Sequence, residues 1–513
     1  MRKIFKKTAL LSGLTFFSRV LGVVRDALIA MCFGTSSQSD AFFVAFRPFD
    51  LVRKLFSEGI LSMSFVPVFS ETMERKGKSR AVALGFSFFC FLSLAGVLVV
   101  LAGIVFAPLV IKIIAPGFRA DPVQYDLTIL LLKLMLPYFW LVLITALCMG
   151  VLNAVGNFGV PASAPIVFNL VVIVFTLLVD HYFKIPVMGL AVGVTIGGVL
   201  QLAIQIPFMI RLGMLNPAFF SFFQPEMVTV LRTMIPCMIG AASYQVNIMV
   251  ASFFASTLDD GSVSFLYYAD RLVQFPMALF AVSAATVFLP ALSRKAVKGQ
   301  LDDIAVLFSN GVKLVLFITI PAMAGLMALG ENIVAVLFGH GAFNDLAVQQ
   351  TADSLFFLVS GLWAFTGVRL FVTLYYALSC IKIPFYSGIL AMGMNLVLCP
   401  LLVDCLGLRG LALSVSLSAM AGFVFLFVNI PGIVRIDKTQ IIVSACRSVF
   451  LSAIMFIFVR QAAGLIVMEK ANGFWFGAGV IGCIGFGMVV YWSVNCLVSS
   501  PELKMLKQGI GRE

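Results

Sequence analysis

The sequence contains few charged residues. Only 11% of its 513 residues are charged, whereas 61% are hydrophobic. Soluble domains carry about 25% charged residues, so this composition excludes a soluble globular fold. The charge that is present is mostly basic, with 35 Lys and Arg against 23 Asp and Glu and a formal net charge of +12.

Histidine is almost absent, and cysteine forms no motif. The two histidines, His181 and His340, lie in predicted loops. The ten cysteines are scattered, nearly all within apolar runs, without a Cys-x-x-Cys pair. Zinc sites and disulfide frameworks need clustered or regularly spaced ligands, so the cysteines are interpreted as small core residues. We expect no metal and no other cofactor.

Long apolar runs dominate the chain. Runs of about 20–30 residues are typical of membrane-spanning helices, whereas the strands of a β-barrel are shorter and alternate. The first run carries charges and is too long for a signal peptide, so we expect it to be retained. Fourteen segments are predicted, at 8–33, 40–70, 81–114, 126–152, 159–181, 185–211, 227–257, 263–292, 305–329, 347–379, 383–404, 409–431, 438–463 and 473–499. The predicted fold is an all-α polytopic membrane protein with about fourteen transmembrane helices.

The basic residues gather at the ends of these segments rather than on one face, which argues against a nucleic-acid partner. If the N-terminus is cytoplasmic, the cytoplasmic loops and tail hold Arg75, Lys76, Lys78, Arg80, Arg294, Lys295, Lys298, Arg435, Lys438, Lys504, Lys507 and Arg512. The loops on the opposite side of the membrane are less basic. The positive-inside rule therefore predicts that both termini are cytoplasmic.

The chain contains a weak internal repeat at an offset of about 223 residues. The stretch from Phe65 to Ser70 matches that from Phe288 to Ser293, and Pro161 matches Pro384. An offset of six helices leaves both copies in the same membrane orientation, the parallel repeat of transporters that move two lobes about a central cavity. The predicted parts are an N-lobe at 1–211, a linker at 212–226, a C-lobe at 227–435, two additional helices at 436–500 and a cytoplasmic tail at 501–513.

The first apolar segment contains Arg19, Arg25 and Asp26. A charge at this depth costs about 2.5–3.5 kcal/mol on insertion scales, so it must face protein or water. At 100° per residue the polar groups of this segment share less than half of the helix circumference. This side is mostly cationic, which indicates a cavity for an anion.

Further charges occur in the second and eighth segments, and they allow two interpretations. The acids and bases could pair within a closed bundle. Alternatively, some arginines wait for an anionic ligand, because the guanidinium keeps its charge when desolvated and binds phosphate bidentately. We favour the second interpretation for Arg19, Arg25 and Arg271. The other charged candidates, which support the network or a gate, are Asp26, Asp40, Arg53, Lys54, Glu58, Asp270 and Arg369.

Several of these residues lie in longer recognisable strings: Phe17–Gly22, Arg25–Ala27, Ser39–Phe46, Phe65–Pro67 and Tyr267–Leu272. With these strings the sequence resembles the MurJ (MviN) family of lipid II flippases, within the multidrug, oligosaccharidyl-lipid and polysaccharide exporters. The resemblance implies a transporter, not an enzyme. It would carry undecaprenyl-pyrophosphate-linked disaccharide-pentapeptide across the bacterial cytoplasmic membrane for peptidoglycan synthesis and cell shape.

The resemblance also assigns roles. Arginines at the positions of Arg19, Arg25 and Arg271 are implicated in binding the pyrophosphate, and the helices at 436–500 correspond to a groove for the polyprenyl tail. The implied partners are lipid II, membrane lipids and the peptidoglycan synthesis machinery. Some members of the family hold sodium with carboxylates from two helices, but here the segment at 227–257 lacks an acid, and the segment at 383–404 has one only at its end. Asn247 and Asn395 are weak candidates for a cation site.

Three alternatives remain open. Another exporter of the same superfamily would share the fold, although a drug antiporter for organic cations needs acids rather than arginines in its cavity. A membrane enzyme acting on polyprenyl phosphates commonly needs clustered Asp for Mg²⁺ or a nucleophilic His, and neither appears. A structural scaffold gives no reason for buried arginines. Reconstitution of the purified protein with labelled lipid II would distinguish these alternatives.

Overall fold

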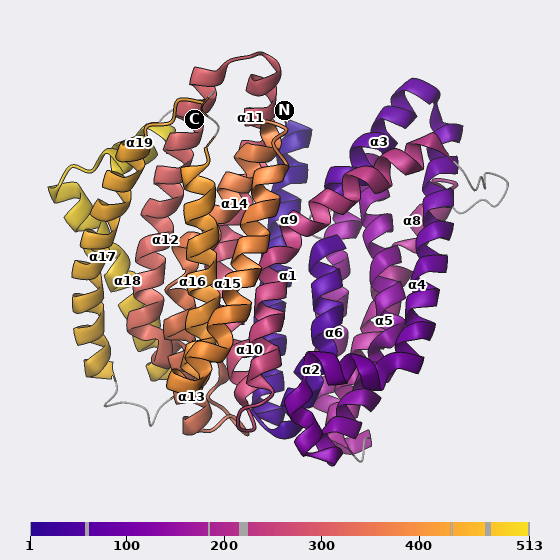
Figure 1. Cartoon of the computed structure of the whole chain (residues 1–513), viewed down its shortest axis with the longest axis horizontal. Coiled ribbons are helices and arrows are strands. Elements are labelled where there is room, and N and C mark those ends of the chain that lie inside the picture. Colours follow the sequence, from indigo (N-terminus) through magenta and orange to yellow (C-terminus); the bar gives the residue numbers. More distant parts are fainter. Residues whose placement is uncertain are drawn as a thin grey trace. The chain divides into compact units, whose positions relative to one another are not determined.

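The structure is a computed structural model that describes residues 2–56, 61–182, 185–214, 224–430, 432, 434–466 and 473–510. Within these residues the secondary structure is helical, with no β-strand (Figure 1). The predicted all-α fold class is confirmed. The chain divides into two compact units, which are described separately.

Unit 1 comprises the chain up to Gln245 together with two short segments, Asp259–Ser264 and Gly341–Phe343. Its helices are α1 (Arg2–Phe33), α2 (Ser37–Leu55), α3 (Leu61–Lys76), α4 (Lys78–Ile114), the 3-10 helix η2 (Pro116–Ala120), α5 (Pro122–Ala154), α6 (Gly159–Tyr182), α7 (Pro186–Ala203), α8 (Ile206–Arg211) and the first part of α9 (Pro225–Ala255). Only residues 212–214 and 224–226 of the predicted linker are described.

Unit 2 comprises Val246–Leu258, Phe265–His340 and the chain from Asn344 onwards. It contains the end of α9, then α10 (Ser262–Pro276), the π-helix η4 (Met277–Val282), α11 (Ser283–Val297), α12 (Leu301–Phe338), α13 (Asp345–Val359), α14 (Leu362–Ala377), α15 (Lys382–Leu406), α16 (Leu408–Val428), α17 (Lys438–Ile466), α18 (Gly473–Leu497) and α19 (Pro501–Ile510). The first three residues of α10 belong to unit 1.

The sequence repeat recurs in the helix boundaries. Helix α4 begins at Lys78 and α12 at Leu301, and helix α6 begins at Gly159 and α15 at Lys382. Both pairs are separated by 223 residues, which is the offset of the repeated strings. The single helix α5 corresponds to the bent pair α13 and α14, whose axes differ by 44°. How far the two predicted lobes act as separate domains stays a prediction.

Nine helices of the described chain are long and apolar enough to cross a membrane, and ten if α13 and α14 form one span. This confirms a polytopic membrane protein. The other four predicted segments coincide with α1, α2–α3, α9 and α10–α11. Three of the four carry the charged residues singled out from the sequence, and α2–α3 and α10–α11 are also broken. Their membrane crossing stays a prediction.

The interior of unit 1 is built around α5. Asp121 accepts a hydrogen bond from the backbone N–H of Val123 and so caps this helix, while Pro122 occupies the first turn. Tyr138 at its middle is fully buried. A Cβ at Gly198 of α7 would lie only 2.4 Å from the Tyr138 ring. Glycine at this position therefore allows α7 to approach α5 closely.

The additional helices α17 and α18 pack against α12 within unit 2 (Figure 1). Their apolar contact includes Phe317 of α12, Met455 of α17 and Tyr491 of α18, and the Tyr491 hydroxyl donates to the Phe317 carbonyl at 3.0 Å. In the first turn of α19, Glu502 is buried and accepts hydrogen bonds from Ser444 and Arg447 of α17. This ion pair holds α19 against the start of α17.

Glu226 joins three elements of unit 1. Its carboxylate lies in the first turn of α9, before the predicted span at 227–257, and is 7% exposed. Lys76 at the end of α3 donates at 2.9 Å, and Arg80 in the first turn of α4 donates at 3.2 Å. Burial opposes ionisation, but these donors outweigh it and lower the pKa of Glu226 from 4.5 to about 2. The carboxylate is therefore ionised at neutral pH.

We expect Glu226→Gln to lower the thermal midpoint of unfolding at pH 7. The free energy of unfolding should fall by only about 1 kcal/mol, because the partners of Glu226 are partly exposed. A depressed carboxyl pKa contributes stability that is present above pH 4.5 and is lost as the pH falls towards 2. The difference between wild type and variant should therefore shrink below pH 4.5. The matched control is Glu71→Gln, because Glu71 pairs with Arg75 on an exposed surface. An equal effect of both substitutions would contradict this account.

Candidate functional site

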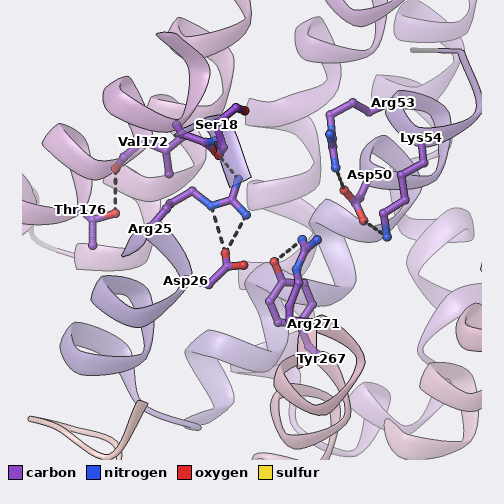
Figure 2. A network of polar contacts seen from close by, with 11 residues as sticks. Ser18, Arg25, Asp26, Asp50, Arg53, Lys54, Val172, Thr176, Tyr267 and Arg271 are labelled. Carbon is purple, nitrogen blue, oxygen red and sulfur yellow. Dashed lines mark hydrogen bonds and ion pairs between the residues drawn. The ribbon is translucent and has the colours of Figure 1, made fainter. Parts of the chain in front are cut away.

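Arg25 and Asp26 form the central ion pair of α1. The Arg25 guanidinium donates through Nε at 3.0 Å and through Nη2 at 2.6 Å to Oδ1 of Asp26 (Figure 2). The two side chains are only 11% and 6% exposed. Adjacent residues on a helix do not normally face each other, so the arginine must fold back along the helix to reach its neighbour. The predicted grouping of these two residues is present in unit 1.

Asn169 of α6 is a third member of this cluster that the sequence reading missed. Its Oδ1 accepts from Nη1 of Arg25 at 3.0 Å, and its Nδ2 donates to the Ser18 carbonyl at 3.0 Å. Asn169 is 7% exposed. A single asparagine in the apolar run from Gly159 to Tyr182 gives no sequence motif. The only available signal was its polarity within an otherwise apolar helix.

Arg19 is half-buried on the same helix. No hydrogen bond or ion pair of Arg19 occurs within the part of the chain that the structure describes. Because Asp26 already pairs with Arg25, these three residues leave one net positive charge on α1.

Asp50 of α2 carries two basic partners. Oδ1 accepts from Arg53 at 2.7 Å and Oδ2 from Lys54 at 2.9 Å (Figure 2). Lys54 also donates to the side-chain oxygen of Gln245 at 3.3 Å. The structure therefore brings Arg53 and Lys54 together on one carboxylate, with one excess positive charge.

Asp40 does not bind any of the arginines in the contacts described. It lies in the first turn of α2 and accepts from the backbone N–H groups of Gly261 and Ser264, both at 2.8 Å, and from the Ser264 hydroxyl. All three donors belong to the turn segment Asp259–Ser264 of unit 1. A carboxylate that accepts three hydrogen bonds fixes this turn. Glu58, another predicted member of the supporting network or gate, lies outside the described residues.

In unit 2, α10 carries the remaining predicted arginine of the site. Nη2 of Arg271 donates to the Tyr267 hydroxyl at 2.6 Å, and its guanidinium lies 4.6 Å from the centroid of that ring (Figure 2). The contact combines a hydrogen bond with a cation–π interaction one turn apart. Asp270 is buried and accepts from Gln274. Arg369 lies half-buried on α14.

Asn395 of α15 is fully buried, and its amide is occupied. Its Nδ2 donates to the Asn247 carbonyl of α9 at 2.8 Å, and its Oδ1 accepts from Ser414 at 2.7 Å. Cys399 is a weak donor to the same oxygen. Groups of three or more His, Cys, Asp or Glu that could hold a metal do not occur among the described residues. Oδ1 of Asn247 is buried without a hydrogen-bond partner among the described residues, so the oxygens that this cluster offers to a cation are neutral.

The pattern of charges and helices agrees with comparisons to known proteins. The family model described as "Lipid II flippase MurJ" matches residues 29–477 of this chain. The chain belongs to the MurJ family of lipid II flippases. This is a family of transporters, not of enzymes.

Relatives at similar identity cover most of the chain or nearly all of it. The "Probable lipid II flippase MurJ" of Vibrio cholerae is 33% identical over 99% of this chain and 98% of its own length. The "Lipid II flippase MurJ" of Burkholderia cenocepacia is 32% identical over 83% of this chain and 84% of its own. The family assignment thus extends over both units.

Solved structures agree. The structure described as "Lipid II flippase MurJ, inward closed conformation" superposes with a TM-score of 0.79 and 26% identity, covering 96% of this chain and all of the other. An inward-facing multidrug resistance MATE transporter of the MOP superfamily superposes with a TM-score of 0.69 at 13% identity, covering 85% of this chain and 98% of the other. The second likeness shows only a shared fold.

Proposed function

We propose that this chain carries lipid II, the undecaprenyl-pyrophosphate-linked disaccharide-pentapeptide, across the bacterial cytoplasmic membrane. Membership of the MurJ family supports lipid II as the substrate, because the relatives that match most of the chain are named lipid II flippase or probable lipid II flippase. The transported lipid II serves peptidoglycan synthesis. Both termini of the chain lie in the cytoplasm.

The observation that carries the proposal is the charge of α1. Arg25 is held by Asp26 and Asn169 at 11% side-chain exposure, and the Arg19 charge is not offset by a described partner. A pyrophosphate diester brings about two negative charges, which guanidinium groups can bind through charge-assisted hydrogen bonds. A multidrug antiporter for organic cations would need the opposite sign of charge. Arg271 is proposed as the contribution of α10 to the same anion.

The proposed mechanism is alternating access by two lobes, 1–211 and 227–435. The helix boundaries repeated at 223 residues support it, because parallel repeats are typical of transporters that rock two halves about a site. The helices at 436–500 are proposed to accommodate the polyprenyl tail. Their outward side is apolar, with exposed Phe450, Ile457 and Met488.

The experiment is reconstitution of the purified chain in liposomes that contain fluorescent lipid II. Transport is measured by the fraction of probe that a membrane-impermeant reagent can reach with time. Wild-type protein should increase this fraction without changing the chemical structure of the lipid. Chemical conversion of the probe would indicate an enzyme, and no change would contradict the proposal.

We expect Arg19→Ala and Arg25→Ala each to abolish flipping in this assay at normal expression and membrane insertion. The reason is loss of the cationic groups that face the pyrophosphate. Arg→Lys at either position should restore transport only in part, since lysine keeps the charge but lacks the planar fork. Lys112→Ala is the control, because Lys112 lies in the last turn of α4 outside these clusters. Wild-type flipping by either alanine variant would contradict the assignment.

We further expect transport to be independent of sodium and to respond to membrane potential. The Asn247–Asn395–Ser414 cluster consists of neutral groups, so it offers no negative charge to a dehydrated cation. A charge moved through 100 mV gains about 2.3 kcal/mol, enough to bias transport. The measurement compares flipping in sodium, potassium and choline with and without an imposed potential. Activity that follows a sodium gradient at constant potential would overturn this expectation.

A further inference from the structure

Asn169 connects two helices of unit 1 through both ends of its amide. The carbonyl oxygen accepts from Arg25 and the nitrogen donates to the backbone of Ser18. Ser18 and Arg25 are seven residues apart on α1, so they lie two turns apart on one face. The Asn169 side chain on α6 therefore contacts two residues of α1 that lie two turns apart.

Gly22 lies between these two contacts on α1. A Cβ added there would be 3.8 Å from Nδ2 of Asn169, which is an ordinary van der Waals distance, and no other atom lies nearer. The amide thus rests directly above the glycine. A large side chain at Gly22 would displace it, whereas alanine would not.

The orientation of Arg25 depends on partners on both sides. Asp26 binds Nε and Nη2, and Asn169 binds Nη1, so three of the five N–H groups are occupied. One N–H on each terminal nitrogen has no partner among the contacts that the structure describes. A pair of donors on a planar guanidinium matches two oxygens of a phosphate group.

Neutrality is important at this position. A carboxylate in place of Asn169 could also accept from Arg25, but it would add a second negative charge next to Asp26. The amide holds the guanidinium without reducing its charge. Asn169 is 7% exposed, and a hydrogen bond in such a low-dielectric environment is stronger than in water.

We propose that Asn169 is a positioning residue that presents Arg25 to the anionic pyrophosphate of the substrate. This inference rests on the proposed function for the identity of the anion, but not for the contact between Asn169 and Arg25. Asn169 acts through Arg25 and itself contributes no charge to substrate binding.

The test uses the purified full chain as wild type, Asn169→Leu, Asn169→Asp and Arg25→Ala. The matched control is Thr176→Val, because Thr176 lies on the same helix and is 1% exposed. Among the described residues its hydroxyl donates only to the Val172 carbonyl of its own helix, at 2.7 Å (Figure 2). Gly22→Ala is a second control. Three quantities are measured: the Kd for inorganic pyrophosphate, the lipid II concentration that half-saturates flipping, and the thermal midpoint of unfolding.

We expect Asn169→Leu to raise the Kd for pyrophosphate and the half-saturating concentration by about 10-fold, as for the loss of one hydrogen bond to a charged group. Asn169→Asp should weaken anion binding at least as much while preserving the thermal midpoint, because the added carboxylate stabilises Arg25 but cancels its charge. A purely structural role would instead lower the midpoint in Asn169→Leu and leave Asn169→Asp binding pyrophosphate normally. Both controls should match wild type.

The outcomes separate this inference from the proposed function. If wild type flips lipid II and Asn169→Leu binds pyrophosphate as wild type does, the positioning role is wrong and the proposed function stands. If wild type binds pyrophosphate in an Asn169-dependent manner without flipping lipid II, the positioning role stands and the proposed function is wrong. Absence of pyrophosphate binding by wild type overturns the positioning role.

Discussion

The arrangement of the charged residues depends on the free-energy cost of transferring an arginine side chain out of water. A guanidinium in an apolar helix must find acceptors, and the apolar part of α1 contains Arg19 and Arg25 but only one acid, Asp26. Arg25 meets this need with Asp26 and Asn169, whereas Arg19 is half-buried without a described partner. The remaining positive charge is the basis for the proposal of an anionic ligand. The packing of α6 against α1 supplies the neutral acceptor.

The acidic residues of unit 1 have different partners, although they look alike in the sequence. Asp26 and Asp50 pair with bases close to them on their own helices. Asp40 instead accepts from backbone N–H groups of the turn Asp259–Ser264, more than 200 residues later. Pairing within the bundle therefore accounts for Arg25, Arg53 and Lys54, whereas an anionic ligand for the remaining positive charge stays a prediction. Some charges are paired within the bundle, and the cations exceed the acids beside them.

Much of the fold could be predicted from the sequence. The apolar segments are helical where they are described, and the strings around Pro67 and Pro290 indicated a repeat that the helix boundaries also show. The helices outside the nine candidate spans include those that carry most of the charged candidates, because charges make a helix less apolar. The joining of Arg19, Arg25 and Arg271 in one site stays a prediction.

The sequence by itself determined the helical class, the repeat and the cationic character of α1, because these follow from composition and from periodicity along the chain. Only the tertiary structure decided which partner each polar group finds. Asn169 reaches Arg25 across 144 residues, and Asn395 reaches the backbone of Asn247 across 148. A lone asparagine in an apolar run carries no periodic signal. Its role arises because helix packing places its amide beside a specific donor and acceptor.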